Sequence, residues 1–164
     1  RQRLALMPGT DITVLGTAIH ACIALSFVDV SQPITHDEAD RLLRTHGLEG
    51  RIVVDALLAQ IKAFHHWVTT RWPQHTPYPE IPVQAIWQNG QIMNGRIDLL
   101  LDTPDGWVLI DHKSNPQGSS TWEGLAQKYA GQLDAYAKAV KKATGRPVVE
   151  RWLFLPVSGN CIKV

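Results

Sequence analysis

The sequence lacks the features that would place it in several classes of protein. It has only two cysteines, Cys22 and Cys161, far apart in a chain of 164 residues, so it cannot build a four-cysteine iron–sulfur or zinc site. No stretch approaches the roughly 18–20 uninterrupted apolar residues that a membrane span needs, and no basic-then-apolar segment at the start indicates secretion. We therefore expect reduced thiols, no membrane association and a cytoplasmic location.

A strong charge of one sign is also missing. The formal net charge is +1 with His neutral, unlike the large basic excess of proteins that coat nucleic acid. Binding to nucleic acid would therefore depend on a bound metal, a local patch or a neighbouring domain. Apolar residues make up 45% of the chain, enough for one packed domain. Because the chain begins Arg-Gln-Arg without an initiator Met, we expect residues 1–164 to be one domain of a larger protein.

Apolar spacing predicts helices in the first half of the chain. We expect a buried helix over residues 17–28 and another helix over 51–71, which ends at Trp72-Pro73. Between them, Thr35 and Glu38 have the spacing of a capping box that begins a helix reaching about residue 45. Residues 74–82 hold three prolines and are predicted to be loop.

The pattern then changes to that of strands. Residues 81–87, 91–101 and 107–113 are predicted strands, separated by turn signals at Asn89-Gly90 and at residues 103–106. A helix over 122–144, closed by Gly145, and a strand over 148–156 follow. This order predicts an α/β fold whose mixed sheet contains an antiparallel three-strand meander and is flanked by helices.

Two aspartates interrupt the apolar runs of neighbouring strands in this meander. With a four-residue turn over 103–106, Asp102 stands opposite Trp107, and the same register places Asp98 opposite Asp111. Side chains that face each other across two strands have Cβ atoms about 4.5–5.5 Å apart, and like charges there repel. Two facing carboxylates need a cation, and a divalent metal held by carboxylate oxygens is the natural candidate.

Lys113 adds a positive charge two residues beyond Asp111, on the same face of the strand. Carboxylates that hold Mg²⁺ or Mn²⁺, beside a cation that offsets developing negative charge, are the parts that phosphodiester cleavage needs. Spacing alone leaves an alternative open, in which Asp111 and Lys113 are a structural ion pair and Asp98 is an exposed edge residue.

Four short motifs resemble those of one nuclease family. Gly95-Arg96-Ile97-Asp98 and Ile110-Asp111-His112-Lys113 resemble the paired metal-binding motifs of RecB-like PD-(D/E)XK nucleases. Two further segments, Gly16-Thr17-Ala18-Ile19-His20 and Gln132-Leu133-Asp134-Ala135-Tyr136, resemble the N-terminal helix motif and the Q-x-x-x-Y motif of that family. Each motif alone is weak, but the four occur in the family's order on the expected helix, strand, strand and helix.

The resemblance implies a restriction-endonuclease-like core and a role for each matching residue. His20, Asp98, Asp111 and the backbone carbonyl of His112 would bind Mg²⁺ or Mn²⁺. Lys113 would position the attacking water or stabilise the charge of the transition state. The catalytic set would be completed by two residues of the helix after that strand, Gln132 and Tyr136, which contact the lysine or the DNA.

Three of these residues also have an ordinary structural interpretation. His20 in an apolar helix fits a hydrogen-bonded core histidine, and Gln132 and Tyr136 fit helix surface and core. Glu80, directly ahead of the first predicted strand, is a secondary candidate for the metal. The remaining metal-ligand types, His65, His66 and His75, lack supporting motifs and are expected to be structural.

The resemblance also implies partners. We expect the nuclease domain of a RecB- or AddA-type helicase–nuclease in double-strand break repair, more exonuclease than endonuclease, acting on single-stranded DNA or duplex ends. Its partners would be a helicase domain in the same chain and a second protein similar to RecC or AddB. Two alternatives remain, namely a free-standing Cas4-like or phage-type exonuclease without an iron–sulfur cluster, and a DNA-binding module that has lost catalysis.

Overall fold

The computed structural model describes residues 3–87, 89–114 and 118–164, and the chain divides into two compact units. The helical unit comprises Arg1–Pro73, His112–Gln117 and Leu155–Asn160. The sheet unit comprises Gln74–Asp111, Gly118–Phe154 and Cys161–Val164. Among the described residues, no helix is both long and apolar enough to cross a membrane.

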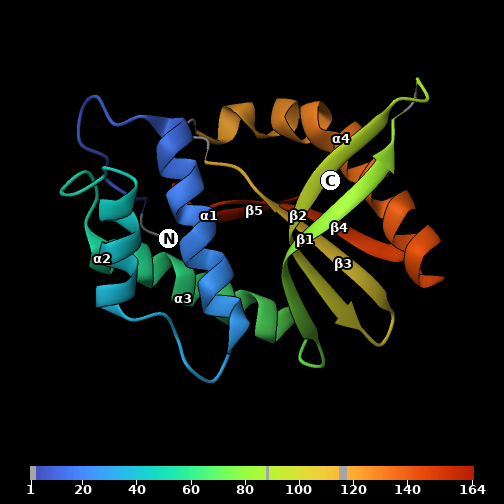
Figure 1. Cartoon of the computed structure of the whole chain (residues 1–164), viewed down its shortest axis with the longest axis horizontal. Helices are drawn as coiled ribbons and strands as arrows, with labels where there is room; N and C mark the ends of the chain where they lie inside the picture. Colours follow the sequence, from blue (N-terminus) through green and yellow to red (C-terminus); the bar gives the residue numbers. More distant parts are fainter. Residues whose placement is uncertain (1–2, 88, 115–117) are drawn as a thin grey trace. The chain divides into compact units, whose positions relative to one another are not determined.

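Three helices form most of the helical unit. They are α1 (Ile12–Val28), α2 (His36–Thr45) and α3 (Val54–Arg71). Helix α2 packs against both α1 and α3 (Figure 1). The apolar faces of the helices supply buried side chains, among them Leu15, Ile19, Ile23, Leu43, Leu57, Ile61, Phe64 and Val68.

Side-chain caps decide where the first two helices begin. The carboxylate of Asp11 accepts hydrogen bonds from the backbone N–H groups of Thr13 and Val14 at 2.8 and 3.2 Å. Helix α1 therefore begins at Ile12, earlier than the predicted residue 17. The predicted capping box of α2 is confirmed, because Thr35 and Glu38 bond to each other's backbone N–H groups.

The sheet unit holds almost all of a five-stranded sheet in the order β1-β2-β3-β4-β5. The strands are β1 (Thr76–Ile86), β2 (Ile92–Thr103), β3 (Gly106–His112), β4 (Val148–Leu155) and β5 (Asn160–Lys163). The pairs β1–β2 and β2–β3 are antiparallel, which confirms the predicted meander. Trp107 at the start of β3 donates its N–H to the carbonyl of Pro147, just ahead of β4, at 2.9 Å. Because β3 and β4 start side by side, they run parallel, and the sheet is mixed as expected.

The prediction of a loop over residues 74–82 is wrong, because β1 already begins at Thr76. Pro77, Pro79 and Pro82 are tolerated since β1 is the first strand of the sheet order, and an edge strand can omit backbone donors on its open side. The short strand β5 was not anticipated either. The other predicted strands are confirmed to within two residues at each end.

Helix α4 (Trp122–Thr144) covers one face of the sheet and packs along β1 (Figure 1). A short 3-10 turn, Ser119–Thr121, precedes it, and Gly145 ends it with φ of 73°, as predicted. The apolar stripe of α4 enters a core shared with the sheet, whose buried members are Ala85, Ile97, Leu100, Leu109, Leu133, Ala135, Tyr136, Val140 and Leu153.

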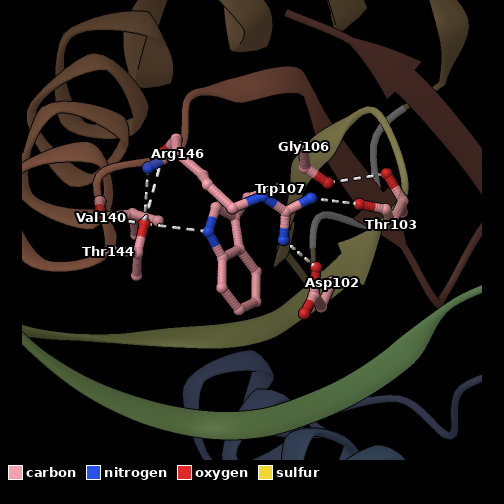
Figure 2. A network of polar contacts seen from close by, with 7 residues as sticks. All are labelled: Asp102, Thr103, Gly106, Trp107, Val140, Thr144 and Arg146. Atoms are coloured by element: carbon pink, nitrogen blue, oxygen red, sulfur yellow. Dashed lines mark hydrogen bonds and ion pairs between the residues drawn. The ribbon is translucent and has the colours of Figure 1, made fainter.

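Arg146 ties the β2–β3 turn to the end of α4 (Figure 2). Its guanidinium donates to the carboxylate of Asp102 and to the carbonyl of Thr103. Trp107 donates from its indole nitrogen to the hydroxyl of Thr144 at 3.0 Å. A pocket of about 470 Å³ opens beside this network, and none of the predicted site residues lines it.

We expect Gly106→Ala to lower the free energy of unfolding by at least about 2 kcal/mol. Gly106 has φ of 140°, and an added Cβ would lie 2.7 Å from the carbonyl oxygen of Pro147. The matched control is Gly124→Ala on α4, where a Cβ meets nothing within 4 Å; it should be neutral or stabilise by up to about 1 kcal/mol. Urea unfolding of both variants measures the difference, and equal stabilities would contradict this account of the turn.

Candidate active site

The sheet unit brings its two predicted carboxylate ligands to the same end of a continuous ladder between β2 and β3. The described register of β2 and β3 runs from Thr103↔Gly106 through Asp102↔Trp107 to Leu99↔Ile110. This is the register predicted from the turn, and the next residues on the two strands are Asp98 and Asp111. Their exposed fractions are only 8% and 3%, so these aspartates are not solvated edge residues.

Glu80 lies at the same level as Asp98 on the neighbouring strand. The β1–β2 register is described up to Pro79↔Leu99 and resumes at Ile81↔Ile97, which leaves Glu80 and Asp98 between these pairs. Glu80 has φ of 54° and is the one non-glycine residue of the described chain with a positive φ. Backbone strain of this kind clusters at functional sites. The carboxylate of Glu80 forms an ion pair of 3.3 Å with Arg96.

The two strands change the face that they present at this level. On the hairpin side of Glu80 and Asp98, odd-numbered residues such as Val83 and Ile97 pack into the core under α4. On the other side, the even-numbered Leu100 belongs to the same core. Regular alternation along β2 cannot place both Ile97 and Leu100 in the same core. The face of β2 that points towards α4 therefore reverses between these two residues. The left-handed backbone of Glu80 on β1 lies at the same level.

Gln132 and Tyr136 fix α4 on β2. The amide of Gln132 donates a hydrogen bond of 3.1 Å to the hydroxyl of Tyr136. A Cβ placed on Gly95 would overlap with that hydroxyl oxygen, so the tyrosine fills the space that a side chain at Gly95 would take. Gly95 is three residues from Asp98, and α4 thereby holds the strand that carries this carboxylate. Contact of Gln132 or Tyr136 with Lys113 or with DNA stays a prediction.

The helical unit brings the predicted histidines together. The imidazole rings of His20 on α1 and His112 at the end of β3 lie edge to face, with 5.3 Å between their centroids. The ring of His112 also meets that of Phe64 on α3 at 5.6 Å and is buried. Anchoring the side chain in this way fixes the backbone of His112, whose carbonyl is the predicted ligand.

Lys113 is held between two residues that contact α1. On one side, the ring of His112 packs on His20. On the other side, Ser114 approaches Gly16 so closely that a Cβ there would lie 3.3 Å from the serine hydroxyl oxygen. Gly16 and His20 are four residues apart and share one face of the helix. The close approach explains why the motif on α1 begins with glycine, and it restricts the backbone on both sides of Lys113.

The donor set of these residues suits a divalent metal. Two carboxylates that are almost fully buried on adjacent strands repel each other in a medium where charge is poorly screened. Carboxylate and carbonyl oxygens together with an imidazole are ligands that Mg²⁺ and Mn²⁺ accept. The residues present therefore fit the metal that the motifs imply.

Of the other residues that could bind a metal or act as a nucleophile, His65 has structural partners and Cys22 has an unreactive thiol. The Nε2 atom of His65 lies 2.9 Å from the hydroxyl of Ser26, and its ring stacks on Phe27. Both cysteines are free in the structure. Burial raises the pKa of Cys22 to about 12, so its thiol stays protonated and unreactive.

Because the hydroxyl of Tyr136 fills the space over Gly95, Gly95→Ala should cost about 1–3 kcal/mol of stability. Removal of that hydroxyl relieves the shortest contact of the new methyl group, although the Cζ atom of the ring would still lie 2.9 Å from it. In a Tyr136→Phe background we therefore expect the cost of Gly95→Ala to shrink by about 1 kcal/mol or more. A double-mutant cycle measured by urea unfolding tests this, and additive effects of the two substitutions would show that the predicted contact is absent.

Comparison with known proteins bears on this arrangement. The chain is similar to a protein of Desulforudis audaxviator that is named as part of an ATP-dependent helicase/nuclease, 38% identical over 57% of this chain and 8% of that protein. A protein of the same name from Thermoanaerobacter is 26% identical over 82% of this chain and 11% of its own length. The chain thus spans about a tenth or less of these relatives. The family model described as the PD-(D/E)XK nuclease superfamily matches residues 2–159, and the chain belongs to this superfamily.

Proposed function

We propose that the chain is a DNA nuclease domain that depends on Mg²⁺ or Mn²⁺. The observation that carries the proposal is the pair of buried carboxylates, Asp98 and Asp111, that follow a continuous β2–β3 ladder. His20 and the carbonyl of His112 would complete the ligand set. One family model covers residues 2–159, which supports a single nuclease domain built from both units.

The roles of the chain's own residues follow from their chemistry. A divalent ion held here would polarise the scissile phosphate and would lower the pKa of a water molecule towards neutrality. Asp98 and Asp111 supply the negative charge that retains the ion. Lys113 cannot be a ligand while it is protonated, so its ammonium group positions the water or offsets negative charge that develops on the phosphate.

We further propose that the domain belongs to a helicase–nuclease. The relatives are named as components of an ATP-dependent helicase/nuclease, and they are many times longer than this chain. On that basis the partners would be a helicase domain in the same polypeptide and a second protein similar to RecC or AddB, all in the cytoplasm. A helicase delivers separated strands, so we propose exonucleolytic cleavage of single strands or duplex ends.

The first functional prediction is metal dependence. The chain should cleave a labelled single-stranded oligonucleotide in the presence of Mg²⁺ or Mn²⁺ and should be inactive in EDTA, because the carboxylate pair requires a cation. Gel electrophoresis of the products measures cleavage, and Asp111→Asn serves as the inactive control. Undiminished cleavage in EDTA would refute the proposed metal site.

The second functional prediction separates Lys113 from the ligands. Lys113→Ala should bind Mn²⁺ about as well as the parent chain but cleave DNA about 10²–10³ times more slowly. Asp111→Ala should lose metal binding and cleavage together. Lys141→Ala, at an exposed position in the last turn of α4, is the control for loss of one positive charge.

Calorimetric titration with Mn²⁺ and single-turnover cleavage together distinguish the outcomes. If Lys113→Ala cleaves DNA at the rate of the parent chain, the lysine is only an ion-pair partner. If it loses Mn²⁺ binding as Asp111→Ala does, the lysine supports the metal site itself rather than the reaction.

A further inference from the structure

The β1–β2 hairpin has one face that nothing in the sheet unit covers. Along β2, Met93 and Gly95 face α4, whereas Ile92, Asn94 and Arg96 alternate with them and are exposed. Their partners on β1 are Ile86, Gln84 and Pro82, which are exposed as well. These six residues form three cross-strand pairs, here called the outer face of the hairpin.

The outer face leads to Asp98. Ile92, Asn94 and Arg96 occur at every second position of β2, and Asp98 lies two residues beyond Arg96, at the level where the strand faces reverse. A strand advances about 3.4 Å per residue, so the six residues from Ile92 to Asp98 correspond to about 20 Å of surface. A substrate that lies along this face would therefore extend to the level of the proposed metal ligand.

The composition of the outer face suits a single strand of nucleic acid. Between residues 81 and 97 the chain has no acidic residue, and its only charge is Arg96. Arg96 pairs with Glu80 at 3.3 Å with 60% of its side chain exposed. Exposed pairs of this kind contribute little to stability, so the guanidinium can exchange its partner for a phosphate.

The other two pairs offer contacts of different kinds. The amide of Gln84 donates to the side-chain oxygen of Asn94 at 3.1 Å, and each side chain keeps a further hydrogen-bonding atom for a base or a phosphate. Ile86 and Ile92 have exposed fractions of 62% and 67%, and they form an apolar step at the hairpin end. Aliphatic side chains in nucleic-acid interfaces pack against the faces of bases in this way.

We propose that the outer face of the hairpin binds single-stranded DNA and guides it to Asp98. The proposal rests on the nuclease function proposed above and adds a substrate-binding surface to it. A protein partner on the same face is the alternative. DNA is favoured because the face leads towards the level of a proposed metal ligand and its one charged side chain is an arginine, whereas two isoleucines make a small apolar area for a protein interface.

Binding is measured separately from cleavage. Fluorescence anisotropy of a labelled 20-nucleotide oligothymidylate in EDTA reports affinity for the parent chain, for the double variant Ile86→Ser/Ile92→Ser and for Arg96→Gln. We expect the double variant to bind about fivefold more weakly or worse. For Arg96→Gln, the slope of log affinity against log salt should fall by about 0.7, the value for one phosphate contact on a single strand.

The matched control is Val28→Ser/Val53→Ser, which removes two exposed apolar side chains of the helical unit and should leave affinity unchanged. All substituted positions are exposed, and thermal melting checks that each variant folds. If the isoleucine variant and Arg96→Gln bind as the parent does, or if the parent chain binds no oligonucleotide, the guiding surface is refuted. Cleavage by the parent in Mg²⁺ is scored separately, so a refuted surface leaves the proposed nuclease function standing, and a parent that binds without cleaving refutes only the nuclease.

Discussion

The burial of Asp98 and Asp111 next to the β2–β3 ladder is the constraint on which the proposed site depends. Carboxylates that are buried on neighbouring strands repel each other, and they destabilise the sheet unless positive charge or hydrogen bonds compensate them. Tyr136 holds β2 from one side through Gly95, and the β2–β3 turn fixes the register in which the two acids follow the ladder. On the proposal made above, this pair of carboxylates would bind a divalent ion.

Much of this arrangement could be predicted from short-range rules. The turn at residues 103–106 sets the register of β2 and β3, which the structure describes up to Leu99↔Ile110, one residue before each aspartate. Side-chain capping by Thr35 and Glu38, and the glycine at residue 145, mark helix ends because their chemistry acts within one turn. The order of the four motifs indicated the superfamily to which the chain belongs.

The features that escaped prediction depend on contacts distant in sequence. The prolines of β1 indicated a loop because proline disfavours a central strand, and only the sheet order shows that β1 lies at an edge. The left-handed conformation of Glu80 has no local signal, since glutamate has no preference for it. The need for glycine at residue 95 becomes visible only when α4 places Tyr136 over it.

The prolines of β1 have a consequence for the behaviour of the chain in solution. An edge strand exposes backbone donors and acceptors to which a strand of another molecule can add, and growth of such pairing leads to aggregation. Pro77, Pro79 and Pro82 have no N–H group to offer, so only the short segment of β1 after Pro82 has an uninterrupted series of donors. The residues that made the strand hard to recognise thus protect the open edge of the sheet from self-association.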